Sequence, residues 1–301
     1  MRTKSITKLI LAAFLSIPCL SHAQQAKKTD NGYAIEAANK AYGDFYTFHS
    51  DTMNKDFPVL VFLPENYGKD KKEFPVVYML HGANGAALTE EGVRSIYNPK
   101  TGFKEAATDF QVVIVCPLVG NKSYLNSPIN KEDKYASLIA FELVRFTESK
   151  FKVIKNRENR ILAGFSMGAY GSVSLVCRYP DIFSGALARG GGYDSKTMIE
   201  ELHWDESMSK GVLGSYWEYP QNHHLNSCLN LMNRLKDRKD VCFVIEIGRE
   251  DFLYRTNKKL EAKLKDLSMP YIYAEYPGGH VFNKNIVYSL LTHLQFFKET
   301  K

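Results

Sequence analysis

The sequence predicts an α/β fold in which a mostly parallel central sheet is covered by helices on both faces. Continuously apolar segments such as residues 74–80 (FPVVYML) and 241–247 (VCFVIEI) are typical of strands that are buried on both sides of a sheet. Segments with the hydrophobic spacing of helices alternate with these strands, which is the pattern of repeated βαβ units. The composition, with 45% hydrophobic and 24% charged residues, is that of a globular protein.

Each element is predicted from hydrophobic periodicity and from the glycine and proline residues that end it. Strands are expected at residues 45–51, 57–63, 74–80, 112–116, 161–163, 186–188, 241–247 and 271–276. Helices are expected at residues 135–149, 173–178, 228–235, 253–267 and 286–297. The carboxyl ends of parallel strands meet at one edge of the sheet, where α/β proteins bind their ligands. Residues that directly follow a strand are therefore the candidate functional residues.

The first 23 residues have the pattern of an export signal. Arg2, Lys4 and Lys8 precede an apolar run at residues 9–17, and Ser21-His22-Ala23 matches a small-x-small cleavage site. The apolar run is about half the length of a membrane-spanning helix, which needs roughly 20 residues. We therefore expect an exported protein, periplasmic or secreted, that has no membrane contact after cleavage.

Two alternatives to signal cleavage remain open at this point. One is a retained N-terminal anchor, and the other is lipid modification of Cys19, although Pro18 precedes it where such sites usually carry a small residue. With cleavage, the expected organisation is a partly loose segment at residues 24–44 and a single domain at residues 45–301.

The charge of the chain argues against nucleic acid as a partner. The whole chain carries a formal net charge of +6. Removing residues 1–23 takes away three basic and no acidic residues, which leaves 36 Lys and Arg against 33 Asp and Glu. The resulting net charge of +3 is too small to indicate binding to nucleic acid or to an anionic membrane.

Four cysteines follow the signal: Cys116, Cys177, Cys228 and Cys242. An exported chain could form disulfides, but most of these residues lie in apolar segments that are predicted strands or helices. Their spacing contains no CxxC pair and no zinc pattern. Buried free thiols are therefore expected for most of them.

A serine flanked by glycines follows the strand predicted at residues 161–163. The segment Gly164-Phe165-Ser166-Met167-Gly168 fits G-x-S-x-G, and residues 167–178 after it have helical character. A nucleophile elbow requires this strand–turn–helix context, because the tight turn exposes the hydroxyl and the glycines let strand and helix approach closely. We predict that Ser166 is a nucleophile, with a tight turn that happens to contain a serine as the alternative.

A serine nucleophile needs an adjacent base, which is usually a histidine. Of the eight histidines, His280 is the one that Pro277-Gly278-Gly279 places in a loop after the strand predicted at residues 271–276. This loop is also the last one before the C-terminal helix. We predict that His280 is the base.

The third member of such a triad orients the imidazole and stabilises its charged form. It should follow a strand between the serine and the histidine in the chain. Asp251, just after the strand predicted at residues 241–247, is the predicted acid. Its neighbour Glu250 and the earlier Asp194 remain alternatives.

Acyl transfer places negative charge on a carbonyl oxygen, and backbone N–H groups are the usual donors that stabilise it. The N–H of Met167 is one predicted donor. The N–H of Ala83, in the loop after the strand at residues 74–80, is the other. His81 in the same loop is expected to have a structural role.

These residues and their surroundings resemble the esterase D and feruloyl esterase branch of the α/β-hydrolases, over roughly residues 45–298. The matching stretches, in order, are FPVLVFLPENY (57–67), FPVVYMLHG (74–82), SYLNSP (123–128), ILAGFSMG (161–168), YPDIF (179–183), GRED (248–251) and PGGH (277–280). Their order and spacing are specific for the branch, although not for a substrate. The resemblance implies the α/β-hydrolase fold and ester hydrolysis through an acyl-enzyme, without metal or cofactor. Carried over one by one, the family's nucleophile falls on Ser166, its acid on Asp251 and its base on His280.

The sequence departs from the family pattern at two places expected near the pocket. Val281-Phe282 follows the histidine, and residues 188–192 (ARGGG) stand where a strand typically ends in Ser-Gly. Both departures leave the acyl specificity open. Arg189 is a candidate contact for an anionic substrate group, with a salt bridge to a nearby acid as the alternative.

The leading functional hypothesis is a serine carboxylic ester hydrolase that deacylates carbohydrate esters of the acetyl or feruloyl type, since export would bring it to polysaccharides. An acyltransferase with the same triad is one alternative, and a non-catalytic carbohydrate-binding protein on a hydrolase fold is the other. Several aromatic residues in predicted loops either stack on sugar or aryl rings or cover the core edges: Tyr124, Tyr193, Trp204, Tyr216 and Trp217.

Overall fold

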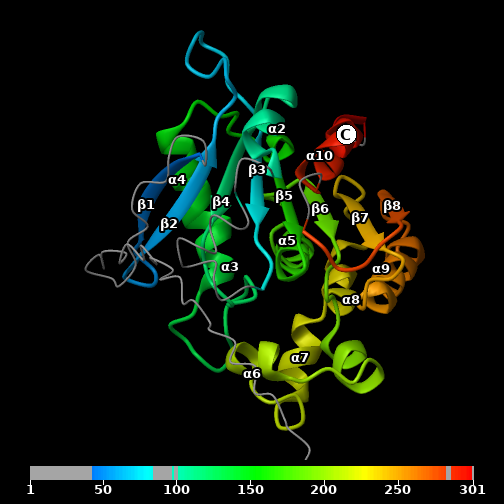
Figure 1. The fold of residues 1–301 in the computed structure, drawn as a ribbon. Coiled ribbons are helices and arrows are strands. Elements are labelled where there is room, and N and C mark those ends of the chain that lie inside the picture. The colour runs from blue at the N-terminus through cyan, green and yellow to red at the C-terminus, as the bar shows by residue number, and fades with distance from the viewer. Residues whose placement is uncertain (1–42, 84–96, 98–100, 283–285, 300–301) are drawn as a thin grey trace, which may run out of the picture.

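The computed structural model describes residues 43–83, 97, 101–282 and 286–299. They form a sheet of eight strands with helices on both faces (Figure 1). The strands are β1 (Asp44–Ser50), β2 (Lys55–Phe62), β3 (Val76–Leu80), β4 (Val113–Pro117), β5 (Arg160–Phe165), β6 (Gly185–Arg189), β7 (Cys242–Gly248) and β8 (Tyr271–Tyr276). Their order across the sheet is β1-β2-β4-β3-β5-β6-β7-β8. β2 is antiparallel to β1 and β4, and the pairs from β4 to β8 are parallel.

Helices cover both faces because alternate side chains of each strand point to opposite sides of the sheet. In β7, Phe243 and Ile245 belong to the apolar cluster on one face, while Cys242 and Val244 belong to the cluster on the other. Residues of α3 (Tyr135–Ser137), η4 (Leu138–Leu143), α4 (Val144–Lys150), α5 (Met167–Arg178), α8 (Cys228–Leu231), η7 (Met232–Leu235) and α9 (Tyr254–Asp266) pack in the first cluster. Residues of α2 (Phe103–Asp109), α10 (Ile286–Leu291) and α11 (Phe296–Glu299) pack in the second.

The structure confirms the predicted α/β fold with a mostly parallel sheet. All predicted strands are present, with bounds that differ by one or two residues at most. The helix predicted at residues 135–149 is also present, but its middle turn, η4, is a π-helix. The helix after Ser166 begins directly at Met167, because the turn itself starts it.

The segment between β6 and α8, residues 193–227, contains helices that the sequence did not predict. These are η6 (Thr197–Glu201), α6 (Ser207–Leu213) and α7 (Pro220–Asn226). We call residues 193–227 the cap, since α6 and α7 lie beyond the edge of the sheet at which the parallel strands end (Figure 1). Long-range bonds hold the cap: Ser127 Oγ donates to Val212 O at 2.6 Å.

The predictions for the N-terminus lie almost entirely outside the described residues. This holds for the export signal at residues 1–23 and for residues 24–42 of the predicted loose segment. Asp44, at the end of that segment, already pairs with Val61 in the sheet. In the part of the chain that the structure describes, no helix is long and apolar enough to cross a membrane.

The four cysteines of the described residues are buried and form no disulfide, in agreement with the expectation for most of them. Burial raises the pKa of the Cys177 thiol to about 12. Burial also raises the pKa of the Cys116 and Cys228 thiols well above the usual range. These side chains therefore act as small apolar groups in the core.

Candidate active site

Ser166 lies in a sharp turn between β5 and α5, with φ 56° and ψ −117°. A positive φ is strained for a residue that has a side chain, at a cost of about 1–3 kcal/mol. Both backbone groups of Ser166 are held: its N–H donates to Arg189 O at 2.9 Å, and its carbonyl accepts from Tyr170 N at 3.1 Å. The turn therefore has the conformation that the sequence predicted for a nucleophile elbow.

The two glycines of the G-x-S-x-G motif are required by close packing. A Cβ on Gly164 would lie 2.2 Å from Gly168 O, and a Cβ on Gly168 would lie 1.9 Å from Leu80 O. No side chain fits at such distances, so only glycine lets α5 approach β3 and β5 closely enough to form the turn.

His280 links Ser166 to Asp251 through hydrogen bonds at both ring nitrogens. Nε2 lies 2.9 Å from Ser166 Oγ, and Nδ1 lies 2.8 Å from Asp251 Oδ2. The Asp251 side chain is fully buried, and its other oxygen accepts the N–H of Leu253 at 2.8 Å. Since a carboxylate only accepts, Nδ1 carries the proton, which leaves Nε2 free to accept the proton of the serine hydroxyl.

The two alternative acids contact other groups in the described structure. The Glu250 carboxylate accepts the N–H of Gly278, and the Glu250 N–H donates to Gly278 O at 3.2 Å. Asp194 Oδ2 accepts the N–H and the hydroxyl of Thr197 at 3.0 and 2.7 Å. Glu250 thus joins the loop of the acid to the loop of the histidine, Asp194 caps η6, and Asp251 is the carboxylate brought to His280.

The two predicted oxyanion donors, Met167 and Ala83, line the same pocket as Ser166 and His280. The Met167 N–H belongs to the first turn of α5, where an α-helix offers no internal acceptor. The positive end of the helix dipole lies at the same place. A negatively charged oxygen beside Ser166 would therefore lie at the N-terminal end of α5.

His81 supports the loop that carries Ala83. Its side chain is buried, with Nδ1 at 2.8 Å from Gly82 O and Nε2 at 3.2 Å from Val119 N. Burial lowers the pKa of His81 to about 4. At neutral pH the ring is uncharged, so it donates to the carbonyl and accepts from the N–H, in agreement with the structural role that was expected.

Arg189 does not line the pocket, so the possible substrate contact is not supported. Its Nη2 and Nε lie 2.7 and 2.8 Å from Glu246 Oε2, and Nη2 lies 3.0 Å from Ser289 Oγ. The guanidinium also stacks on the Tyr276 ring, 4.3 Å from its centroid. The side chain is only 7% exposed. The salt bridge, which was the alternative interpretation, is the arrangement found.

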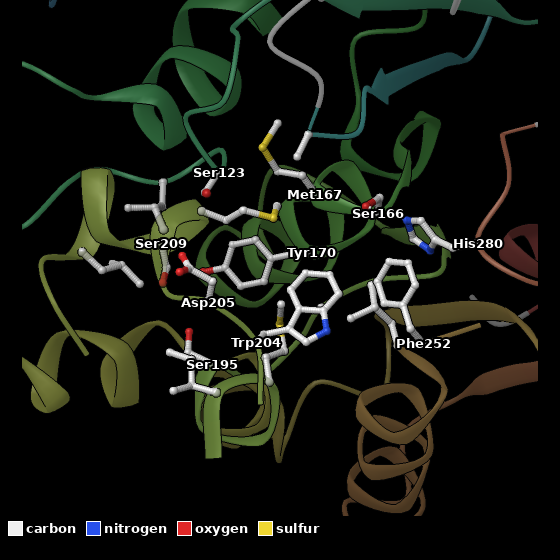
Figure 2. Close-up of a pocket in the computed structure, with 18 residues that line it drawn as sticks. Ser123, Ser166, Met167, Tyr170, Ser195, Trp204, Asp205, Ser209, Phe252 and His280 are labelled. Carbon is white, nitrogen blue, oxygen red and sulfur yellow. Dashed lines mark hydrogen bonds between the residues drawn. The ribbon is translucent and has the colours of Figure 1, made fainter. Parts of the chain in front are cut away.

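A cavity of about 250 Å³ begins at Ser166 and His280 and extends beneath the cap (Figure 2). Most of its walls are apolar, and they include Met198, Ile199, Trp204, Met208, Leu213, Phe252 and Leu253. Its polar lining includes Ser123, Ser195, Asp205 and Ser209. The described residues contain no cluster of three or more His, Cys, Asp or Glu side chains that could hold a metal ion.

Comparison with known proteins places the chain among the esterases. A family model described as "Putative esterase" matches residues 50–294. The chain belongs to this family. The enzyme is 26% identical over 251 residues to the acetyl esterase of Caldicellulosiruptor saccharolyticus, an alignment that covers 77% of this chain and 90% of that protein.

Solved structures support the same fold for this esterase. One is a ferulic acid esterase, with a TM-score of 0.63 and 23% identity over 85% of this chain and 98% of that chain. Another is an S-formylglutathione hydrolase from Agrobacterium tumefaciens, with a TM-score of 0.68 and 19% identity over 88% of this chain and 98% of that chain. The predicted esterase D-like branch and α/β-hydrolase fold are confirmed, and the enzyme is a serine carboxylic ester hydrolase.

Sequence reasoning missed most of the wall of the esterase pocket, and the five loop aromatics have different environments. Phe252 was not singled out, although its position directly after the predicted acid is a signal that could have found it. Of the five, Trp204 alone lines the pocket. Tyr124, Tyr193 and Tyr216 are buried, whereas Trp217 is 69% exposed.

Proposed function

We propose that this esterase is exported and hydrolyses carbohydrate esters through an acyl-enzyme formed on Ser166. The observation that carries the proposal is the hydrogen-bonded series Ser166–His280–Asp251 at one end of an apolar pocket. Each member has the partner that its role requires: a base for the hydroxyl, and a buried carboxylate for the base.

In the first half-reaction, Ser166 Oγ attacks the carbonyl carbon of the ester while its proton passes to His280 Nε2. The C–O bond to the alcohol then breaks, and the same proton moves from Nε2 to the departing alkoxide. In the second half-reaction, a water molecule gives its proton to Nε2 and attacks the acyl-enzyme. The carboxylic acid is released when the proton returns to Ser166 Oγ.

The negative charge that forms on the carbonyl oxygen would be held by the N–H groups of Met167 and Ala83. Both residues border the cavity next to Ser166. Such donors are most effective when they are fixed before the reaction. The helix that begins at Met167 and the buried His81 provide this rigidity.

The pocket favours a large apolar acyl group over acetyl. A cavity of about 250 Å³ lined by Trp204 and Phe252 offers more apolar surface than an acetyl group can cover. An aryl acyl group of the feruloyl type fits this lining, since aromatic rings pack well against other aromatic rings. Among the proteins that resemble this one, one is named an acetyl esterase and another a ferulic acid esterase.

Covalent labelling tests the mechanism directly. The full chain is treated with a fluorophosphonate, digested, and analysed by mass spectrometry, and we expect the added mass on the peptide that contains Ser166. Ser166→Ala should remove both the label and the hydrolysis of p-nitrophenyl acetate, butyrate and methyl ferulate. Labelling at another serine, or an active Ser166→Ala variant, would refute the proposed nucleophile.

The substrate class and the location have their own tests. Methyl ferulate should give a higher kcat/KM than a methyl ester of acetic acid, and a reversed order would refute the aryl preference.

Analysis of the reaction products with an added sugar acceptor separates hydrolysis from acyl transfer. An acylated sugar in place of the free carboxylic acid would indicate an acyltransferase. N-terminal sequencing of the protein from the periplasm or medium should begin at Gln24, whereas an intact N-terminus would refute export by cleavage.

A further inference from the structure

Five aromatic rings form a continuous series that passes through the imidazole of His280. Phe252 lies 4.5 Å from the His280 ring, and Phe165 lies 4.6 Å from it, between ring centroids. Trp204 extends the series on the side of Phe252, at 4.8 Å, and Phe282 extends it on the side of Phe165, at 5.6 Å. Figure 2 shows Trp204, Phe252 and His280 along one wall of the pocket.

The two phenyl rings that touch His280 are adjacent in sequence to the other members of the triad. Phe165 is the last residue of β5 and precedes Ser166. Phe252 follows Asp251 directly. The elements that hold the nucleophile and the acid therefore also place an aromatic ring against the base.

Phe165 stacks on the imidazole with an interplanar angle of 30°, and Phe252 is tilted against it with an interplanar angle of 43°. The two nitrogen atoms of the imidazole are already occupied, Nδ1 by Asp251 and Nε2 by Ser166. Of these two partners, Asp251 is the one that carries a charge. The faces of the ring are therefore a further place where neighbouring groups can stabilise positive charge on it.

Aromatic faces carry negative electrostatic potential and attract a cation that lies within about 6 Å of the ring centroid. The imidazole is neutral before the reaction and becomes a cation when it takes the proton of Ser166. The same face contact therefore stabilises the transition state more than the resting enzyme, which is the condition for a contribution to rate.

We propose that Phe252 and Phe165 are positioning residues that stabilise the protonated form of His280 through their aromatic faces. This inference rests on the function proposed above, in which His280 carries the proton. It assigns a role to two apolar residues that would otherwise be described only as pocket wall and core.

Phe252 is the residue to test, because it is 46% exposed while Phe165 is only 8% exposed. Phe252→Leu keeps an apolar side chain but removes the aromatic face. We expect kcat for p-nitrophenyl acetate to fall about threefold to tenfold. The acid limb of kcat/KM against pH should move to lower pH by about half a unit, because the protonated imidazole loses stabilisation.

Fluorinated phenylalanines separate the electrostatic effect from packing. Site-specific replacement of Phe252 by mono-, di- and trifluorophenylalanine weakens the negative face in steps and changes the shape of the ring little. We expect kcat to fall and the acid limb to move to lower pH in that same order. A small acetyl ester is the substrate, so that contact between the ring and a large acyl group does not contribute.

Phe141 is a matched control, since it is 47% exposed and contacts Tyr179 rather than His280. The same fluorinated residues at position 141 should leave kcat and the pH profile unchanged. The fluorinated series at position 252 could instead leave kcat and the pH profile unchanged while Phe252→Leu lowers kcat. Packing alone would then explain the effect of Phe252, and the proposal would be wrong. Fluorophosphonate labelling of Ser166 in every variant shows separately whether the proposed nucleophile is intact.

Discussion

The edge of the sheet at which the parallel strands end and the cap that covers it are built in different ways. At the edge, Ser166, Asp251 and His280 each stand directly after a strand, in turns of only a few residues. In the cap, Trp204 and Met208 reach the pocket from short helices and loops that are held by contacts with distant parts of the chain. The reactive groups are thus placed by local rules, and the pocket wall is placed by tertiary packing.

This difference separates chemistry from specificity within one pocket. The residues that would move protons depend on strand ends, which a change in the cap does not displace. The residues that would select the acyl group depend on the cap, whose helices can change without altering the sheet. Mutations at the edge should therefore affect rate or stability, whereas mutations in the cap should affect the choice of substrate.

The largest effect is expected from Asp251→Asn. Both oxygens of Asp251 accept an N–H, from Leu253 and from His280 Nδ1. An asparagine has only one acceptor oxygen, so with that oxygen on Leu253 its NH2 group faces Nδ1 and favours the wrong tautomer of the imidazole, and kcat should fall about 10⁴-fold. Glu250→Gln is the control, because the amide oxygen can still accept the N–H of Gly278, and kcat should stay within about threefold of wild type. Steady-state hydrolysis of p-nitrophenyl acetate measures both. Near wild-type activity of Asp251→Asn would mean that the acid is misassigned.

The next largest effect is expected from the buried ion pair between Arg189 of β6 and Glu246 of β7. Glu246→Leu leaves the Arg189 guanidinium buried without its carboxylate, which should lower the free energy of unfolding by about 3–5 kcal/mol. Urea denaturation at neutral pH measures this value. The double variant Arg189→Met, Glu246→Leu should recover most of the loss, since no buried charge is left unpaired. Equal stability of the single and double variants would contradict this account of the ion pair.

A pH dependence of stability is expected from His81, at the loop that carries Ala83. Burial lowers its pKa from 6.5 to about 4, so the unfolded chain takes up a proton that the folded chain does not. Stability therefore falls as the pH drops from about 6.5 to 4, and the loss approaches about 3 kcal/mol below that range. Urea denaturation of wild type and His81→Gln at pH 7 and 4.5 isolates this contribution. A wild type that loses no more stability than the variant would show that His81 is not buried as a neutral ring.

The smallest effect should come from the cap. Trp204→Ala removes an aromatic wall of the pocket and should lower the ratio of kcat/KM for methyl ferulate to that for p-nitrophenyl acetate by about tenfold. Trp217→Ala is the matched control, because Trp217 belongs to the same cap but is 69% exposed and does not line the cavity. If both variants change the ratio equally, the cap does not act through its pocket wall.

Sequence reasoning succeeded for the edge of the sheet because the sequence patterns that predict it span only a few neighbouring residues. The strand before Ser166, the glycines beside it and the helix after it all lie within residues 160–178. The loops of Asp251 and His280 each follow a continuously apolar or aromatic strand. The chain order of the three residues then left few other choices, and the structure brings the three predicted residues together. Their catalytic roles remain predictions.

The cap could not be predicted because its helices are short and are stabilised by tertiary contacts rather than by their own sequence pattern. α7 contains mainly Gln, Asn and His, without the periodic apolar face that marks a helix in sequence. It is fixed by contacts such as the bond from Asn222 Nδ2 to Leu213 O at 2.8 Å. The environment of Arg189 was undecided for a similar reason, since its partner Glu246 is set by the register between β6 and β7.

The buried thiols have a consequence for what holds the described domain together. Many proteins that fold outside the cytoplasm rely on disulfides, but the four cysteines of the described residues are buried and form none. The thiolate is the form that reacts with oxidants and disulfides, and the raised pKa of Cys116, Cys177 and Cys228 disfavours it. The described fold is therefore held together by packing and hydrogen bonds and contains no disulfide cross-link among these four residues.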